Sequence, residues 1–222
     1  MPTTKRIVVL ANSIKHAPAR CVAGREVEGK GGSLKVGDWI RPVSTKGEGE
    51  LQPNQLKVAG AGQIGVLEVF DVSLISAGTD PAQPENWIID DSQSWRRVET
   101  WPIPRIGALT EMPRDLWLEP GSRKSDRTSE AYIRANLPSQ SLFFLVLSEA
   151  YLCQDQPKKY RLHFNYAGIS HDLSVTDPLV RDRMLRDHRD NTRLRLTSIH
   201  VCVSLTPVFR GDHYKIIAAM IW

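Results

Sequence analysis

The chain has 222 residues, 41% of them hydrophobic and 24% charged, a balance that is typical of soluble globular proteins and excludes a largely disordered chain. This length accommodates one large domain or two small ones. The net charge of +4 and the pI of about 9.0 are compatible with a polyanionic partner, but many proteins without such a partner are equally basic.

Cysteine spacing and apolar run length bear on the compartment. Cys21, Cys153 and Cys202 are far apart and form no C-x-x-C pair, so neither a zinc site nor a disulfide framework is indicated. No apolar run approaches the roughly 20 residues that span a bilayer. Residues 1–6 lead directly into an apolar strand pattern without a cleavage-site motif. We therefore expect buried free thiols and a cytoplasmic protein.

Residues 5–44 predict the start of a small β-barrel that presents cations from one edge. Two strand patterns flank a short basic connector, and a third, aromatic-led strand follows a loop rich in glycine and charge. Cations on such loops can pair with phosphates, the main source of nonspecific affinity for nucleic acids. The alternative is a solvated loop whose charges only maintain solubility. The candidate residues here are Lys15, His16, Arg20 and Arg25.

Trp39 and Arg41 alternate along the third strand, so their side chains project from the same face. Together they could form a platform on which a nucleic-acid base stacks. The favoured interpretation of Trp39 is instead a core residue, whereas Arg41 stays open between a ligand contact and a place at the rim. Pro42 places this strand near a sheet edge, because proline cannot donate to a ladder.

Short strands dominate the chain, and helices are few. The alternating and β-branched runs predict strands near 6–11, 20–26, 38–43, 65–76, 86–89, 95–101, 141–152, 159–165, 170–175, 196–204 and 213–221. Glycine and proline make residues 45–65 a long loop. Such spacing favours barrels or sandwiches over a parallel α/β sheet.

Capping signals mark the predicted helices. Asp177 followed by Pro178 opens a helix to about residue 190, in which Val180 and Met184 share one face. Ser129 caps a second short helix, and residues 112–118 could form a third of one turn.

A proline- and charge-rich zone separates two strand-rich halves. We expect a first barrel over residues 1–105, a linker over 106–128, and a second barrel over 129–222 that includes the helix near 178–190.

Two further clusters of basic residues are candidates, and the first also contains an aromatic residue. Trp95, Arg96 and Arg97 interleave as in single-strand binding sites, although tryptophans can equally be ordinary core residues. Arg123, Lys124 and Arg127 lie in a polar run that could clamp a backbone or merely act as a linker.

Residues 181–195 form the densest arginine region of the chain. Arg183 and Asp187, and likewise Arg186 and Asp190, stand at i, i+4 spacing, which favours a salt-bridged exposed helix face. Arg193 remains a candidate for a bidentate phosphate contact.

Four stretches together resemble a known family. They are Lys5–Ser13 with Arg20–Gly24, Trp39–Ser44, Leu173–Pro178 and Tyr214–Ile221. Their order is similar to that of bacterial proteins carrying a dual OB-containing domain. The resemblance implies two OB-like barrels in one mainly β chain with a few short helices. It further implies nucleic-acid or nucleotide binding and an association with bacterial conflict and defence systems.

No catalytic signature is present. The sequence contains no Walker loop, no G-x-S-x-G elbow and no H-E-x-x-H motif, so we expect no catalytic residues, no metal and no cofactor. The leading hypothesis is a noncatalytic nucleic-acid-binding module of a bacterial defence or stress system, without membrane attachment. The alternatives are a sensor of a small nucleotide or modified base, with its ligand between the barrels, and an adaptor for an effector protein.

Overall fold

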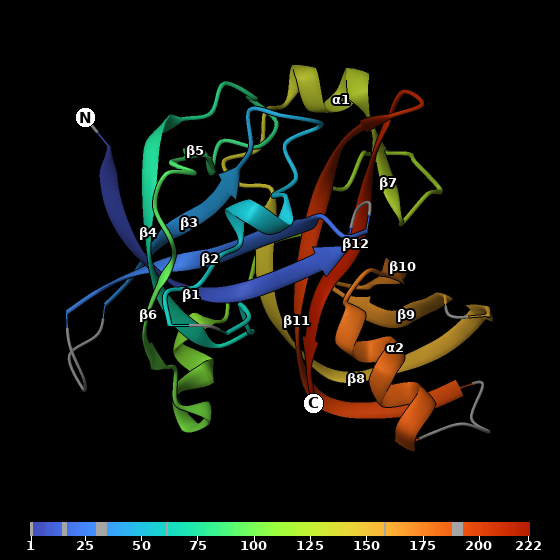
Figure 1. The fold of residues 1–222 in the computed structure, drawn as a ribbon. Coiled ribbons are helices and arrows are strands. Elements are labelled where there is room, and N and C mark those ends of the chain that lie inside the picture. The colour runs from blue at the N-terminus through green and yellow to red at the C-terminus, as the bar shows by residue number, and fades with distance from the viewer. Residues whose placement is uncertain (1, 15–16, 30–34, 61, 158, 188–192) are drawn as a thin grey trace. The chain divides into compact units, whose positions relative to one another are not determined.

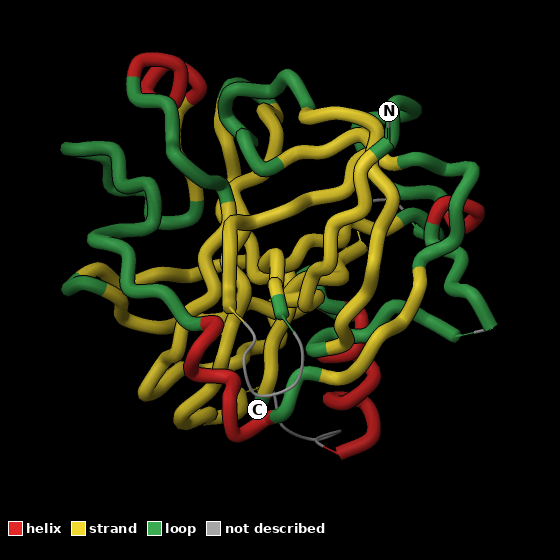
Figure 2. Tube along the Cα trace, turned by 90° about the vertical axis from the view of Figure 1, so that its left-hand side faces the viewer, coloured by secondary structure: helices red, strands yellow, loops and turns green. Residues whose placement is uncertain are grey.

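The computed structural model describes residues 2–14, 17–29, 35–60, 62–157, 159–187 and 193–222, with the backbone alone at 181, 185 and 187. The chain divides into two compact units. The first comprises residues 1–80 and 84–109, and the second comprises 81–83 and 110–222. Residues 106–128, the predicted linker, are divided between the two units. Figure 2 shows that strands make up most of the trace and that helices are short.

Five strands of the first unit close into a ring. Its elements (Figure 1) are β1 (Thr3–Ile14), β2 (Arg20–Glu28), β3 (Lys35–Val43), the 3-10 turn η2 (Pro53–Gln55), β4 (Glu68–Ala77), β5 (Asn86–Ile89), β6 (Arg96–Thr100) and the 3-10 segment η3 (Ile103–Leu109). The strand order is β1-β2-β3-β5-β4, and β4 returns to β1. The β3–β5 pair is parallel and the other pairs in the ring are antiparallel. β6 extends the sheet beside β4.

Alternation along the strands directs apolar residues into the interior of this ring. Ile7 and Val9 of β1 are fully buried in a core cluster that also contains Phe70 of β4 and Trp95. Successive residues of a strand point to opposite faces, so the apolar residue at every second position faces inward. The predicted barrel is thus built from the apolar positions of the strand patterns themselves.

β3 is not an edge strand, so the prediction from Pro42 was wrong. β3 lies between β2 and β5 in the ring. The pairing with β2 ends at Ile40, whereas the pairing with β5 covers Arg41 to Val43. Pro42 therefore lies beyond the part of β3 that pairs with β2, where its missing N–H leaves that ladder intact.

The second unit repeats the same strand order. Its elements are β7 (Arg127–Ser129), α1 (Glu130–Ala135), β8 (Leu142–Gln156), β9 (Lys159–Tyr166), β10 (Ile169–Val175), α2 (Pro178–Asp187), β11 (Arg193–Phe209) and β12 (Asp212–Ile221). The ring runs β8-β9-β10-β12-β11 and back to β8, again with the third and fifth strands parallel. β7 adds to β12. Both rings have the order of a five-stranded Greek-key barrel, which confirms the predicted fold of two OB-like barrels.

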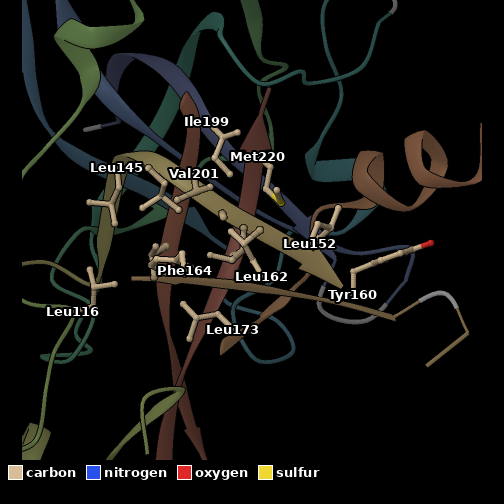
Figure 3. Packing of buried hydrophobic residues seen from close by; sticks show 14 of the residues in the cluster. Leu116, Leu145, Leu152, Tyr160, Leu162, Phe164, Leu173, Ile199, Val201 and Met220 are labelled. Atoms are coloured by element: carbon tan, nitrogen blue, oxygen red, sulfur yellow. The ribbon is translucent and has the colours of Figure 1, made fainter. Parts of the chain in front are cut away.

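The core of the second unit fills its ring. Leu145, Leu152, Leu162, Leu173 and Val201 all belong to one buried cluster, which Figure 3 shows from close by. Ala82 also belongs to this cluster, and Gln83 donates from its side-chain amide to the carbonyl of Leu205 at 3.0 Å. These contacts explain why the tripeptide 81–83 belongs to the second unit.

Two of the three predicted helices are present. Ser129 caps α1 by accepting from the N–H of Tyr132, and Val180 and Met184 bury one face of α2. Residues 112–118 form no helix, and η3 lies upstream of them. Within the described part of the chain, no helix has the length and apolarity needed to cross a bilayer.

Candidate nucleic-acid interface

Most candidate cations of the first unit are held by the protein itself. Lys15 and His16 lie outside the described residues. The Nε of Arg25 donates to the carbonyl of Gly37 at 2.7 Å, and its guanidinium lies 5.8 Å from the ring centroid of Trp39. Arg20 pairs through its backbone with Leu51, and its buried Nη1 has no hydrogen-bond partner among the described residues.

Arg41 and Trp95 are buried, which corrects their assignment to a binding surface. Arg41 is 8% exposed and pairs with Glu85 at 2.9 Å. Trp95 is 1% exposed, and its indole N–H donates to the carbonyl of Gln55 at 2.9 Å. Its ring packs edge-to-face on Phe70. A buried ring has no free face for a base, so the core interpretation applies here, as it does for Trp39.

Arg96 and Arg97 are exposed, but each pairs with a carboxylate. Arg96 contacts Asp71, which also receives two hydrogen bonds from Arg6. Arg97 pairs with Glu68 at 2.7 Å. Burial raises the pKa of Asp71, but the hydrogen bonds and charges of Arg6 and Arg96 outweigh it and hold that pKa below its usual range. These ion pairs leave little net positive charge on this face.

In the second unit, β7 and the loop before it bring basic side chains to β12. Arg127 lies over the ring of Tyr214 with its guanidinium carbon 4.6 Å from the centroid, and it donates to the Tyr214 hydroxyl at 3.0 Å. Lys124 approaches Asp212 at 3.5 Å and remains largely exposed. Arg123 beside it is exposed. The register that pairs Tyr214 with Arg127 sets these neighbours.

The hairpin between β11 and β12 presents an aromatic ring to solvent. Arg210 and Gly211 form its two-residue loop, with φ of 55° and 82°, as a type I′ turn requires. Phe209 is 59% exposed. The guanidinium of Arg210 lies 5.2 Å from the Phe209 ring centroid, and Phe209 lies 6.1 Å from Tyr214.

These residues form one surface, which we call the arginine–aromatic surface. It combines an exposed ring with guanidinium groups on the outer side of β12, and its members are Arg123, Lys124, Arg127, Phe209, Arg210 and Tyr214. Aromatic faces can stack bases, and neighbouring cations can contact phosphates. Three of the predicted residues are gathered here.

A pocket of about 360 Å³ adjoins this surface. Its lining includes Glu119, Ser122, Lys124, Arg127, Ser129 and Asp212. Glu119 accepts from the backbone N–H and the hydroxyl of Ser129, both at 3.0 Å. These hydrogen bonds lower the pKa of the Glu119 carboxyl. The pocket is thus polar, with carboxylates, hydroxyls and cations facing the same space.

A second pocket, of about 400 Å³, lies in the first unit. It is lined by Thr4, Arg6, Glu26 and Asp71, among others. Arg6 is committed to Asp71, and Glu26 receives two hydrogen bonds from Lys5. Among the described residues that line this pocket there is no aromatic side chain, whereas the second unit offers the exposed ring of Phe209 next to its pocket residue Asp212.

Arg193 lies at the opposite end of β11 from Phe209. Its guanidinium lies 4.2 Å from the ring centroid of Tyr151, and Arg195 pairs with Glu149 at 2.5 Å. Arg193 therefore does not join the arginine–aromatic surface. The predicted ion pairs with Asp187 and Asp190 involve side chains outside the described residues.

The sequence patterns did not single out Phe209, Arg210 or Tyr214 as site residues. The available signal was the run Phe209–Asp212, in which glycine marks a tight turn directly after an aromatic residue. A two-residue turn is too short to fold back over the aromatic side chain next to it, so the hairpin itself leaves that ring exposed.

Comparisons with known proteins identify a family but no individual relative. A family model described as a dual OB-containing domain matches residues 5–220. No curated protein and no solved structure matches the chain. Among the described residues, no group of three or more His, Cys, Asp or Glu side chains is arranged to hold a metal ion.

Proposed function

Because the chain belongs to the family of dual OB-containing domains, we propose that it is a noncatalytic module that binds single-stranded nucleic acid through its second unit. The coarser statement, an OB-fold binding module, follows from the family and from the two closed rings. Beyond that statement, we propose that the ligand is a nucleic acid and that the arginine–aromatic surface of the second unit contacts it.

The exposed Phe209, with Arg210 against its ring and Tyr214 beside it, carries the proposal. It lies on the hairpin between the fourth and fifth strands of the second ring. OB folds commonly contact oligonucleotides through this loop, the loop between strands one and two, and the face of strands two and three. Burying a large exposed ring under a base would contribute about 1–3 kcal/mol.

A single strand suits this surface better than a duplex. Stacking on Phe209 requires a base whose face is free, and bases in a duplex are stacked on one another. Arg123 and Lys124 are exposed, and Lys124 approaches Asp212, the ladder partner of Phe209, at 3.5 Å. Both cations could contact the backbone that flanks a stacked base. Arg210 is held over the ring by the turn.

Fluorescence anisotropy with labelled single-stranded RNA and DNA at low salt tests the proposal. We expect binding by the wild-type chain and a loss of about five- to 160-fold in affinity for Phe209→Ala, the range that corresponds to one stacked base. Leu179→Ala is the matched control, because Leu179 is equally exposed but lies on α2.

Equal losses for both variants would contradict the assignment of the surface. Absence of binding to either polymer at low salt would overturn the function itself. A duplex that competes as well as a single strand would overturn the preference for unpaired bases.

A cytoplasmic location remains a prediction from the cysteine spacing and apolar run lengths. A role in a bacterial defence or stress system remains a prediction from the resemblance, and docking of an effector protein remains an alternative. If the chain instead senses a small nucleotide, mononucleotides should raise its melting temperature while oligonucleotides do not bind. Ligand at 100 times its dissociation constant adds about 2.7 kcal/mol of stability.

A further inference from the structure

We propose that the pocket beside the arginine–aromatic surface holds the ribose of one bound nucleotide and thereby selects RNA over DNA. This inference rests on the proposed function, and it adds a substrate class that neither the fold nor the family specifies.

The pocket and the stacking surface share side chains. Arg127 lines the pocket and also lies over Tyr214. Asp212 lines the pocket and pairs with Phe209 in the β11–β12 ladder. A base stacked on Phe209 therefore places its sugar next to the mouth of the pocket.

The balance of charge in the pocket favours a neutral hydroxyl group. Two carboxylates, Glu119 and Asp212, face two cations, Lys124 and Arg127. A phosphate would be repelled by the carboxylates, and a cation would be repelled by Lys124 and Arg127. A ribose carries no charge, and its hydroxyls can both donate and accept hydrogen bonds.

The carboxylates are held in place before a ligand arrives. Both oxygens of Glu119 accept hydrogen bonds from Ser129, and each oxygen retains further acceptor capacity. Asp212 is held by Lys124 at 3.5 Å and by Arg127 at 3.9 Å. Carboxylates are well suited to accept from a ribose 2′-hydroxyl, which is the group that distinguishes RNA from DNA.

The test compares four single strands of one sequence: RNA, DNA, 2′-fluoro RNA and 2′-O-methyl RNA. We expect RNA to bind about tenfold more tightly than DNA, a difference equivalent to about 1.4 kcal/mol. The 2′-fluoro strand keeps an RNA-like sugar conformation but cannot donate a hydrogen bond. It should therefore bind like DNA, and the bulkier 2′-O-methyl strand should bind no better.

Replacing the carboxylates of the pocket with amides tests the same contact by changing the protein instead of the strand. Glu119→Gln and Asp212→Asn should reduce the RNA-to-DNA affinity ratio toward one without weakening DNA binding. Glu149→Gln is the matched control, because Glu149 is an exposed carboxylate of the same unit that pairs with Arg195 outside the pocket. The control should keep the ratio of the wild type.

The outcomes separate the two proposals. Equal binding of RNA and DNA by the wild type would overturn the ribose site and leave nucleic-acid binding intact. Tight binding of the 2′-fluoro strand would show that sugar conformation, and not the hydroxyl, is recognised, which also overturns the site. Failure of all four strands to bind would overturn the proposed function and this inference with it.

Discussion

At the scale of single residues, the availability of a cation depends on its carboxylate partner. Arg41, Arg96 and Arg97 read as binding residues in the sequence, yet each pairs with an acidic side chain in the first unit. In the second unit Arg123 is exposed, and Lys124 stays largely exposed although it approaches Asp212 at 3.5 Å, a longer contact than those of the three arginines. A count of basic residues therefore overestimates the binding surface.

Gly24 is required by the close approach of two strands. A Cβ placed on this residue would lie 2.2 Å from the carbonyl oxygen of Val8, next to the irregularity in the β1–β2 register at Val9. The clashing atom belongs to the backbone, so only movement of a strand could relieve it.

Gly24→Ala should destabilise the first unit by about 1–3 kcal/mol or more, the usual cost of overpacking. Urea denaturation monitored by tryptophan fluorescence measures the change. Gly107→Ala is the control, because a Cβ there would meet nothing within 4 Å. Similar midpoints for the two variants would contradict the clash.

Lys215 places an ammonium group in the interior of the second unit. It faces the interior of the second ring, is 1% exposed, and its Nζ has no hydrogen-bond partner among the described residues. Burial lowers its pKa to about 8, although the charges of Asp115, Asp126 and Glu119 act in the opposite direction.

This lowered pKa predicts how stability depends on pH. Between the folded pKa of about 8 and the unfolded value of 10.5, the unfolded chain binds more protons, so stability rises with pH across this window. Below pH 8 the full cost of the buried charge is present. Lys215→Met should therefore be more stable at pH 7 by about 3 kcal/mol.

The advantage of Lys215→Met over the wild type should shrink as the pH rises from 8 toward 10. Denaturation of both proteins at each pH provides the comparison, and taking the difference cancels titrations that they share, such as that of Tyr166, whose pKa is raised by burial. A constant difference from pH 7 to 10 would refute the assignment.

At the scale of elements, Asp177 joins a helix to a strand. One carboxylate oxygen accepts from the N–H of Leu179 in the first turn of α2, and the other accepts from the N–H of Met220 in β12, both at 2.9 Å. The side chain is buried. It therefore caps α2 and satisfies a buried donor of β12 beyond the parallel β10–β12 pairing.

Asp177→Ala should cost about 2–4 kcal/mol, because it removes a helix cap worth about 1 kcal/mol and leaves a buried N–H unpaired at a cost of about 1–3 kcal/mol. Asp177→Asn should cost less, since one acceptor oxygen remains. Thermal unfolding followed by circular dichroism provides the ranking. If Asp177→Ala lowered the melting temperature no more than Asp177→Asn, Asp177 would not act both as the cap of α2 and as the acceptor for β12.

At the scale of the whole molecule, charge and stacking should contribute separately to binding. For single strands the slope of log K against log salt is about −0.7 per neutralised phosphate. Arg210→Gln should make this slope less negative by about 0.7, whereas Phe209→Ala should lower affinity with little change in slope.

Anisotropy titrations over a range of salt concentrations measure both quantities. Arg195→Gln is the control for charge, because Arg195 is exposed in the same unit and pairs with Glu149. An unchanged slope for Arg210→Gln would remove Arg210 from the phosphate contacts.

Much of the fold could be predicted from the sequence because strands and helix starts are marked locally. The alternating runs located the ring strands, and Ser129 and Asp177 marked the helix starts. β7 was missed because three residues are too few to show a period. The single helical turn predicted at residues 112–118 is absent, because the proline and charged residues there form a loop.

The candidate site was less predictable because it depends on pairs that are distant in sequence. Arg127 reaches Tyr214 only through the pairing of β7 with β12. Arg6 and Asp71 are 65 residues apart, and no local pattern links them. Burial of Trp95 likewise depends on the closure of the first ring.

The sequence by itself therefore determined the elements, because residue alternation and helix caps act within a few residues of the chain. It also determined the family, through the order of its strand motifs. Only the tertiary structure decided which cations stay exposed and which aromatic ring faces solvent. Those properties depend on strand pairing and ring closure, which bring together carboxylates, arginines and rings that are far apart along the chain.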